Sequence, residues 1–188
     1  MANANTPFGL KPIRRAGSMP ESGGLTMYYH PASDATALFI GDPVVKNGSA
    51  DAAGVPGAIR ASAAGVITGV VEGFVPDGVT DRVGYGAAST AFYVLVRDDP
   101  SAEFIIQDTA GTIAAADIGL NAELTAGSGS TYSRRSGFVL DSASKAATAG
   151  LAVKILGLAQ IPGNEFGAYA KIRVKINDHT EANATAGL

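Results

Sequence analysis

The sequence predicts an all-β protein, an antiparallel sandwich or jelly-roll-like barrel with an extended N-terminal arm. Its 188 residues include 24 glycines and 9 prolines, with 46% hydrophobic and 16% charged residues. This mixture is typical of short strands joined by tight turns. From residue 25 onward, short apolar runs alternate with turn-forming residues, and no apolar stripe develops at helical spacing. The length suits one domain with its own core.

Residues 1–24 contain prolines and glycines without hydrophobic periodicity. We expect no regular element there, only an extended arm. One interpretation is a disordered terminus, the usual state of chain ends. The other is an arm that becomes ordered against a neighbouring subunit. In that case Phe8, Leu10 and Ile13 are apolar anchors, and Arg14 and Arg15 provide charge contacts.

The single β domain is expected over residues 25–178, followed by a polar C-terminal tail over 179–188. Apolar runs bounded by turn residues predict strands, which we place at 25–30, 37–40, 43–46, 66–74, 91–97, 103–108, 120–125, 138–141, 151–160 and 168–177. The alanine-rich stretches 110–119 and 142–150 are expected to be loops. So is the stretch from Gly127 to Arg135, which is either a mobile surface loop or a partner contact.

Two of these strands have patterns that bear on interaction surfaces. In the last strand, Lys171, Arg173 and Lys175 alternate with apolar residues, which predicts one buried and one charged face. The charged face is either simply solvated or able to meet an acidic partner or nucleic acid. Residues 151–160 are apolar on both faces apart from Lys154. They therefore predict a strand covered on both sides, inside the fold or by another subunit.

Composition excludes several kinds of site. There is no cysteine, so disulfides, thiolate metal sites and thiol nucleophiles are absent. The net charge of −3 and the pI near 5.3 show that the chain is not basic, whereas domains that bind nucleic acid directly usually are. The chain shows neither a signal peptide nor an apolar run of membrane-spanning length, so we expect no secretion and no membrane contact.

Motifs for catalysis, cofactors and metals are weak. The two histidines are His30, at a predicted strand end, and His179, in a polar tail where a catalytic base would be poorly held. The stretch 84–89 lacks the last glycine of a dinucleotide fingerprint and precedes a strand. The acidic pairs at 77 and 81 and at 98 and 99 lack EF-hand spacing, and turn formation explains them more simply. We therefore expect no catalytic residues, no cofactor, no metal and no enzymatic activity.

Several segments carry a resemblance to a known family. Residues 28–44, which begin Tyr28-Tyr29-His30-Pro31, and residues 161–171, which begin Ile161-Pro162-Gly163-Asn164, resemble segments of the capsid cement or decoration proteins of tailed phages. The stretches 5–12, 67–74, 93–100 and 117–122 also resemble that family, so the likeness spans most of the chain.

This resemblance implies a non-enzymatic virion structural protein, made in the bacterial cytoplasm, that binds the outer surface of a capsid. Its partner would be the phage major capsid protein, whose subunit contacts it would stabilise, and it would self-associate as a dimer or trimer. The main alternative is a β-sandwich binding module for carbohydrate or host-surface adhesion. The absence of tryptophan weakens that alternative. A third alternative is a small β-fold hydrolase, which requires His30 in a pocket beside a carboxylate and a hydroxyl.

Overall fold

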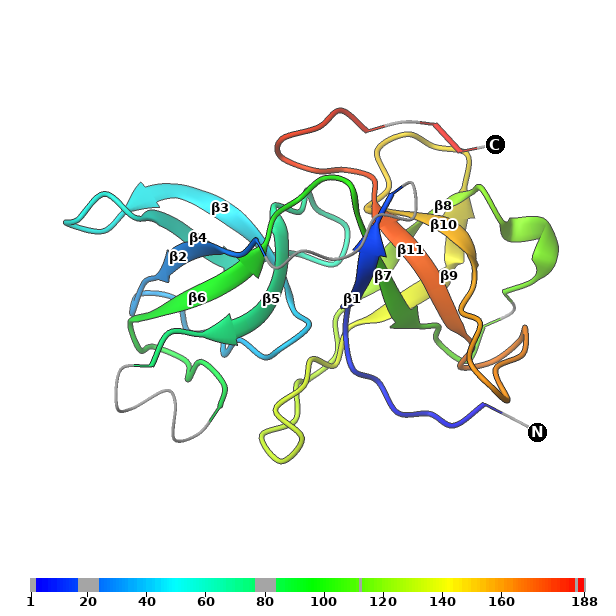
Figure 1. Cartoon of the computed structure of the whole chain (residues 1–188), viewed down its shortest axis with the longest axis horizontal. Coiled ribbons are helices and arrows are strands. Elements are labelled where there is room, and N and C mark those ends of the chain that lie inside the picture. The colour runs from blue at the N-terminus through cyan, green and yellow to red at the C-terminus, as the bar shows by residue number, and fades with distance from the viewer. Residues whose placement is uncertain (1–2, 17–23, 77–83, 112, 185, 188) are drawn as a thin grey trace.

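The computed structural model describes residues 3–16, 24–76, 84–111, 113–184 and 186–187. Its strands form two groups that lie side by side, a closed barrel and a six-stranded sheet (Figure 1). The predicted all-β class and sandwich-like arrangement of sheets are confirmed. Among the described residues, the helical content is one short 3-10 turn, η1 (Ala115–Asp117).

The barrel has the strand order β2-β4-β3-β5-β6. Its strands are β2 (Thr26–His30), β3 (Pro43–Ala50), β4 (Pro56–Arg60), β5 (Gly69–Phe74) and β6 (Phe92–Arg97). All neighbouring strands are antiparallel except β2 and β4, which form a short parallel pair that closes the barrel. Buried side chains that include Tyr28, Leu38 and Val94 fill the interior. The barrel is therefore a packed core and not a channel.

The six-stranded sheet has the order β1-β7-β11-β10-β8-β9. Its strands are β1 (Lys11–Arg15), β7 (Ala102–Gln107), β8 (Asn121–Thr125), β9 (Val139–Ala146), β10 (Val153–Leu158) and β11 (Lys171–Ile176). The sheet curls until its last strand returns to the second, where Leu140 and Asp108 form an isolated bridge. The predicted alternation in β11 is confirmed, since Ile172, Val174 and Ile176 are buried.

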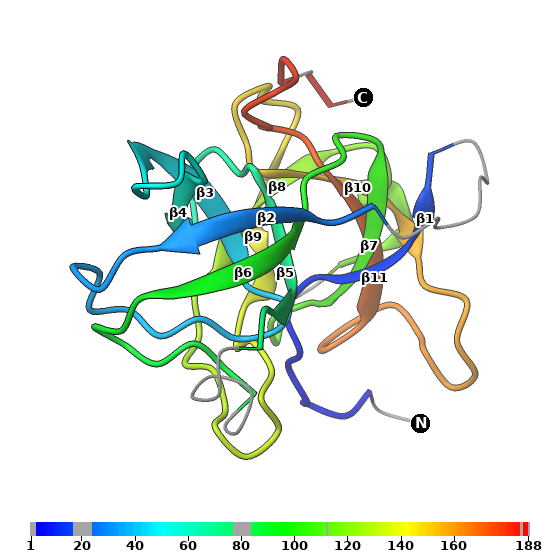
Figure 2. The ribbon, with the colours of Figure 1, turned by 60° about the vertical axis from the view of Figure 1, so that its left-hand side comes forward.

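One hydrophobic core joins the two groups of strands. Ile67 and Val70, next to and within barrel strand β5, pack in the same cluster as Phe104 and Phe138 of the sheet, and all four are fully buried. Burying a large apolar side chain contributes about 1.5–3 kcal/mol. The barrel and the sheet therefore stabilise each other through this shared core. In the turned view of Figure 2 the barrel comes forward and overlaps β8 and β9 of the sheet, while β1, β7 and β11 remain visible beside it.

Several expected element boundaries differ from the structure. No strand forms over 37–40, where Leu38 and Ile40 make only isolated bridges. Strand β4 is not among the predicted strands, because Pro56 and Gly57 resemble a turn. Pro56 occupies the first strand position, where proline is tolerated, and a Cβ on Gly57 would lie 2.4 Å from the Asn47 side chain.

Two segments expected to be irregular belong to the sheet. Strand β9 continues to Ala146, inside the expected loop 142–150, because it pairs with β8. Lys11–Arg15 forms edge strand β1 against β7, so the expectation of no regular element before residue 25 is wrong. Both strands have weak apolar patterns of their own. Pairing with a partner distant in sequence decides their conformation.

Candidate functional site

The N-terminal segment, defined here as residues 3–10, is held against its own chain. The Asn3 side chain donates hydrogen bonds to the carbonyl oxygens of Glu165 and Ala168, at 2.8 and 3.1 Å. The Thr6 amide donates to Gln107 Oε1 at 2.7 Å, and Gln107 Nε2 donates to Asn5 Oδ1 at 2.9 Å. Neither expected state, a disordered end or an arm ordered only by a neighbour, describes this segment.

A close approach of two backbones fixes the end of the N-terminal segment. Gly9 and Gly41 both have left-handed backbone conformations, with φ of 73° and 93°. The Leu10 amide donates to the Gly41 carbonyl at 2.9 Å. A Cβ on Gly9 would lie 2.4 Å from both the Gly41 carbonyl oxygen and the Ser136 Cβ. Only glycine fits here, and this contact fixes the backbone directly after Phe8.

The five residues proposed as partner contacts have different environments. Leu10 is 1% exposed and lies in the shared core, so it is not a surface anchor. Ile13 is half-buried at a bulge in β1. Arg14 is paired with Glu103 at 2.8 Å, and Arg15 is paired with Asp99. Arg15 also lines a small pocket beside Asp98 and Asp99, whereas Phe8 lines a larger groove with basic side chains.

The groove in question lies between the N-terminal segment, the face of the six-stranded sheet and two loops. It encloses about 600 Å³, within the range of about 300–1,000 Å³ that is common for ligand sites. Its apolar floor is formed by Pro7, Phe8, Ile105 and Ile161. Its charged side chains are Lys11, Arg135 and Lys171. Among the described residues, no acidic side chain lines it. We call this feature the basic groove.

The basic groove opens onto the charged face of the sheet. The strand register aligns Lys11 of β1, Ile105 of β7 and Arg173 of β11 in one row. On strands β1, β7 and β11 the acidic residue is Glu103, whose side chain contacts Arg14 at 2.8 Å and Arg173 at 3.4 Å. The face therefore carries a positive charge on a protein whose net charge is −3. The sequence predicted the β11 part of this face but not its continuation onto β1.

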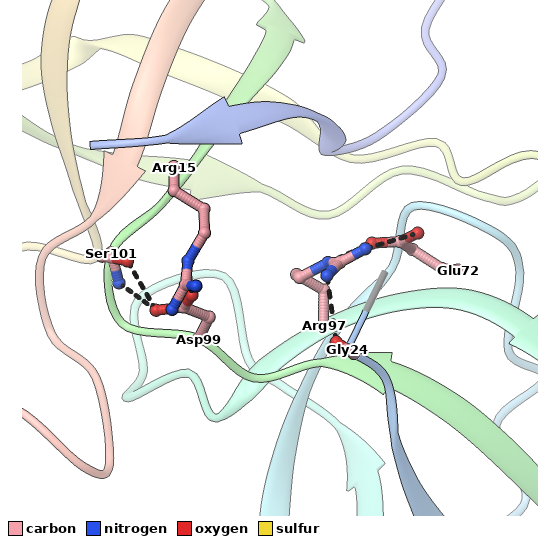
Figure 3. Close-up of polar contacts among 6 residues, drawn as sticks. All are labelled: Arg15, Gly24, Glu72, Arg97, Asp99 and Ser101. Atoms are coloured by element: carbon pink, nitrogen blue, oxygen red, sulfur yellow. Dashed lines mark hydrogen bonds and ion pairs between the residues drawn. The ribbon is translucent and has the colours of Figure 1, made fainter. Parts of the chain in front are cut away.

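Two ion pairs lie near the passage from barrel strand β6 to sheet strand β7, as Figure 3 shows: one reaches from β1 to the β6–β7 turn, and the other joins two barrel strands. Arg15 of β1 contacts Asp99, which also accepts hydrogen bonds from the Ser101 amide and hydroxyl. Nearby, Arg97 of β6 donates to Glu72 at 2.7 Å and to the Gly24 carbonyl at 2.9 Å. Arg15 is thus paired within the chain, while its side chain stays partly exposed.

His30 lies inside the barrel and has no access to solvent. It is fully buried, and its ring stacks on Phe92 with centroids 4.6 Å apart. Nδ1 lies 3.1 Å from the Ala58 carbonyl, and Nε2 lies 4.0 Å from the Asp34 carboxylate. Burial lowers the pKa of His30, which favours the neutral ring. A carboxylate is thus near, but a sealed ring cannot reach a substrate.

His179 is better held than its position in the expected tail suggested. It is 3% exposed, its Nδ1 accepts a hydrogen bond from the Glu181 amide at 3.0 Å, and its backbone forms a bridge with Ile67. Burial lowers its pKa as well. The expectation of a poorly held side chain is therefore wrong. Through its backbone bridge with Ile67, His179 holds the C-terminal residues against the loop that precedes β5.

The acidic pairs considered for metal binding have structural partners where they are described. Asp98 accepts a hydrogen bond from the Tyr28 hydroxyl at 3.0 Å, and Asp99 pairs with Arg15. Asp77 and Asp81 lie outside the described residues. Within the described ranges, no group of three or more potential ligands could hold a metal ion.

The loop between β8 and β9 projects from the same end of the molecule as the N-terminal segment (Figures 1 and 2). It carries Tyr132, which is 96% exposed, followed by Arg134 and Arg135. The Ser130 amide donates to the Arg135 carbonyl and the Arg134 amide to the Ser130 carbonyl, so the loop tip is folded on itself. The adjacency of this loop to the basic groove could not be read from the sequence.

In the part of the chain that the structure describes, no helix has the length and apolar character needed to cross a bilayer. Comparisons of the chain with protein-family models, with curated proteins and with solved structures find no match.

Proposed function

We propose that this chain is a non-enzymatic virion structural protein that binds the outer surface of a phage capsid and stabilises contacts between major capsid protein subunits. The observation that carries the proposal is the basic groove, which lies beside a projecting loop. The side chains that line the groove are already in position in the free protein. The resemblance of residues 28–44 and 161–171 to phage decoration proteins gives the class of partner.

The construction of this surface favours binding over chemistry. The N-terminal segment is fixed by hydrogen bonds and by the Gly9–Gly41 contact, so little ordering is required when a partner binds. The two histidines are buried, and neither lies among the groove residues. A rigid apolar and basic surface is suited to repeated attachment on a lattice, where many modest contacts add up.

A capsid lattice would gain stability from such attachment. A protein that binds the assembled shell but not its dissociated subunits stabilises the shell by mass action. On this proposal the protein is made in the host cytoplasm and resides on the outside of the virion. It would occupy symmetry positions as a dimer or trimer, which sedimentation equilibrium of the free and shell-released protein would measure.

The test is co-sedimentation of the purified protein with empty, expanded shells of the major capsid protein from the same phage. We expect saturable binding at a fixed ratio to capsid subunits and a higher melting temperature of the decorated shells. Shells already saturated with unlabelled protein are the control, and they should take up no labelled protein. Absence of saturable binding would refute the proposal.

One observation favours the alternative of a carbohydrate-binding module. Tyr132 presents nearly its whole ring to solvent, and exposed aromatic rings are platforms on which sugars stack. Glycan-array binding that is lost in Tyr132→Ala would support this alternative. Shell binding unaffected by Tyr132→Ala, with no glycan signal, would remove it.

A further inference from the structure

The three cations of the basic groove differ from most others in the protein. Arg14, Arg15, Lys46, Arg97, Lys145 and Arg173 each form an ion pair with a carboxylate. Among the described residues, Lys11, Arg135 and Lys171 form none, although they line the same cavity. Cations gathered without counter-charges repel one another, and an anionic partner would relieve this repulsion.

The floor between these cations is apolar. Phe8 is half-buried, and Ile161 is 41% exposed although most large apolar side chains of the protein are buried. Interface centres commonly combine a desolvated apolar pocket with a polar rim. The occupant that fits must therefore carry negative charge and at least one large apolar group.

The sheet edge next to the groove is poorly suited to pairing with another strand. Strand β1 contains Pro12, which has no amide hydrogen, and its register shifts between Pro12 and Arg14. Proline and bulges are devices that block strand addition at sheet edges. A partner must then use the side chains of the groove and not the backbone of the edge.

A nucleic acid fits these features less well than a polypeptide does. Nucleic-acid sites that track a backbone use extended basic grooves with aromatic side chains for stacking. Here three cations surround a cavity of about 600 Å³ whose floor combines a single aromatic side chain, Phe8, with Pro7, Ile105 and Ile161, and so offers no row of rings for successive bases. A peptide segment with acidic residues flanking one large apolar side chain matches both the charge and the floor.

We propose that the basic groove binds an acidic segment of the major capsid protein, inserting one large apolar side chain between Phe8 and Ile161 while its carboxylates pair with Lys11, Arg135 and Lys171. This inference rests on the proposed function and names the surface through which it acts. The loop with Tyr132 would form the rim on one side of the bound segment.

The test compares matched variants in quantitative shell binding. Lys11→Gln and Lys171→Gln, singly and together, remove groove charges. As controls, Lys46→Gln and the double variant Lys46→Gln/Lys154→Gln remove the same number of positive charges at positions outside the groove. We expect the groove double variant to bind about 2- to 25-fold more weakly, because each exposed ion pair contributes about 0.2–1 kcal/mol, a factor of about 1.4 to 5. The control variants should bind like the wild type.

A second pair of variants, one test and one control, examines the apolar contact of the proposal. Ile161 and Ile118 have similar exposure, 41% and 45%, but Ile161 lines the groove and Ile118 follows η1. Ile161→Ser should weaken shell binding and Ile118→Ser should not. Unchanged melting temperatures of the free variants would show that the effects are not due to unfolding.

The salt dependence of shell binding shows whether a variant binds more weakly because it has lost a charge contact or because its surface no longer fits the partner. Binding of the wild type should weaken as NaCl rises, and the groove double variant should be less sensitive to salt. If wild-type protein binds shells and the groove variants bind equally well, the inference is wrong while the proposed function stands. If wild-type protein does not bind shells at all, both fail together.

Discussion

Asp108 provides the sharpest physical test of the structure. It follows β7 and forms the bridge to Leu140 that closes the curl of the six-stranded sheet. Its side chain is fully buried, and neither carboxylate oxygen has a hydrogen-bond partner of normal geometry among the described residues. Burial raises the pKa of Asp108 to about 6, although Ser142 and Lys145 nearby partly oppose this.

The direction of the pH effect follows from proton binding. The folded protein holds the Asp108 proton more tightly than the unfolded chain does, so ionisation favours unfolding. Below the ordinary pKa of 3.8 both states are protonated and Asp108 has no unfavourable effect. As the pH rises from 3.8 to about 6 the protein loses stability, and above that range the loss is complete. The shift corresponds to about 3 kcal/mol.

Replacing Asp108 with Asn removes the ionisable group and nearly preserves the shape. We expect Asp108→Asn to be up to about 3 kcal/mol more stable than the wild type at pH 8, with the gain shrinking toward zero near pH 4. Urea denaturation of both proteins at pH values from 4 to 8 measures this difference directly.

The control is Asp141→Asn, at a partly exposed position in β9. Asp141 Oδ1 accepts a hydrogen bond from the Ala143 amide at 3.0 Å, and Asn keeps this acceptor. Asp141→Asn also removes one negative charge but should not reproduce the stabilisation. A difference between Asp108→Asn and wild type that is constant with pH, or a less stable variant at pH 8, would refute this account of Asp108.

Three further predictions concern the core and the N-terminal segment. Gly9→Ala should lower stability by well over about 1–2 kcal/mol, the cost of placing an alanine in the left-handed conformation, because the added Cβ would also collide with the Gly41 carbonyl oxygen and the Ser136 side chain. Gly48→Ala, with a similar φ of 74° and open space around the Cβ, should show the backbone cost alone; equal losses in urea denaturation would contradict the close contact. Phe138→Ala should cost about 3–5 kcal/mol, and a loss below 1 kcal/mol would show that Phe138 does not fill the shared core. Limited proteolysis of the free protein should spare residues 3–16, which are held by the contacts described above; rapid cleavage there would mean that the segment is ordered only on a partner.

Much of the strand pattern could be predicted from local sequence. In β11 the strict alternation of charged and apolar residues identified both the strand and its buried face. The strands β2, β6 and β7 likewise begin and end close to their expected positions. In these segments the apolar pattern and the flanking turn residues agree, so little depends on distant partners.

The remaining elements depend on contacts between distant segments. Lys11–Arg15 has no apolar alternation, and it becomes a strand because β7 offers it an open edge about 90 residues later. Leu10 resembled an exposed anchor, but the close approach of Gly9 and Gly41 places it in the core. The extension of β9 through Ala146 has the same origin, since β8 pairs with it.

By itself, the sequence determined the all-β class, the basic face of β11 and the absence of cysteine chemistry, because these follow from composition and from period-two alternation. The tertiary structure alone decided that Lys11, Arg135 and Lys171 share one groove with Phe8 and Ile161. These residues come from four separate parts of the chain, and only sheet register and loop packing bring them together. Local patterns specify which face of a strand is buried, but not which distant strand lies beside it.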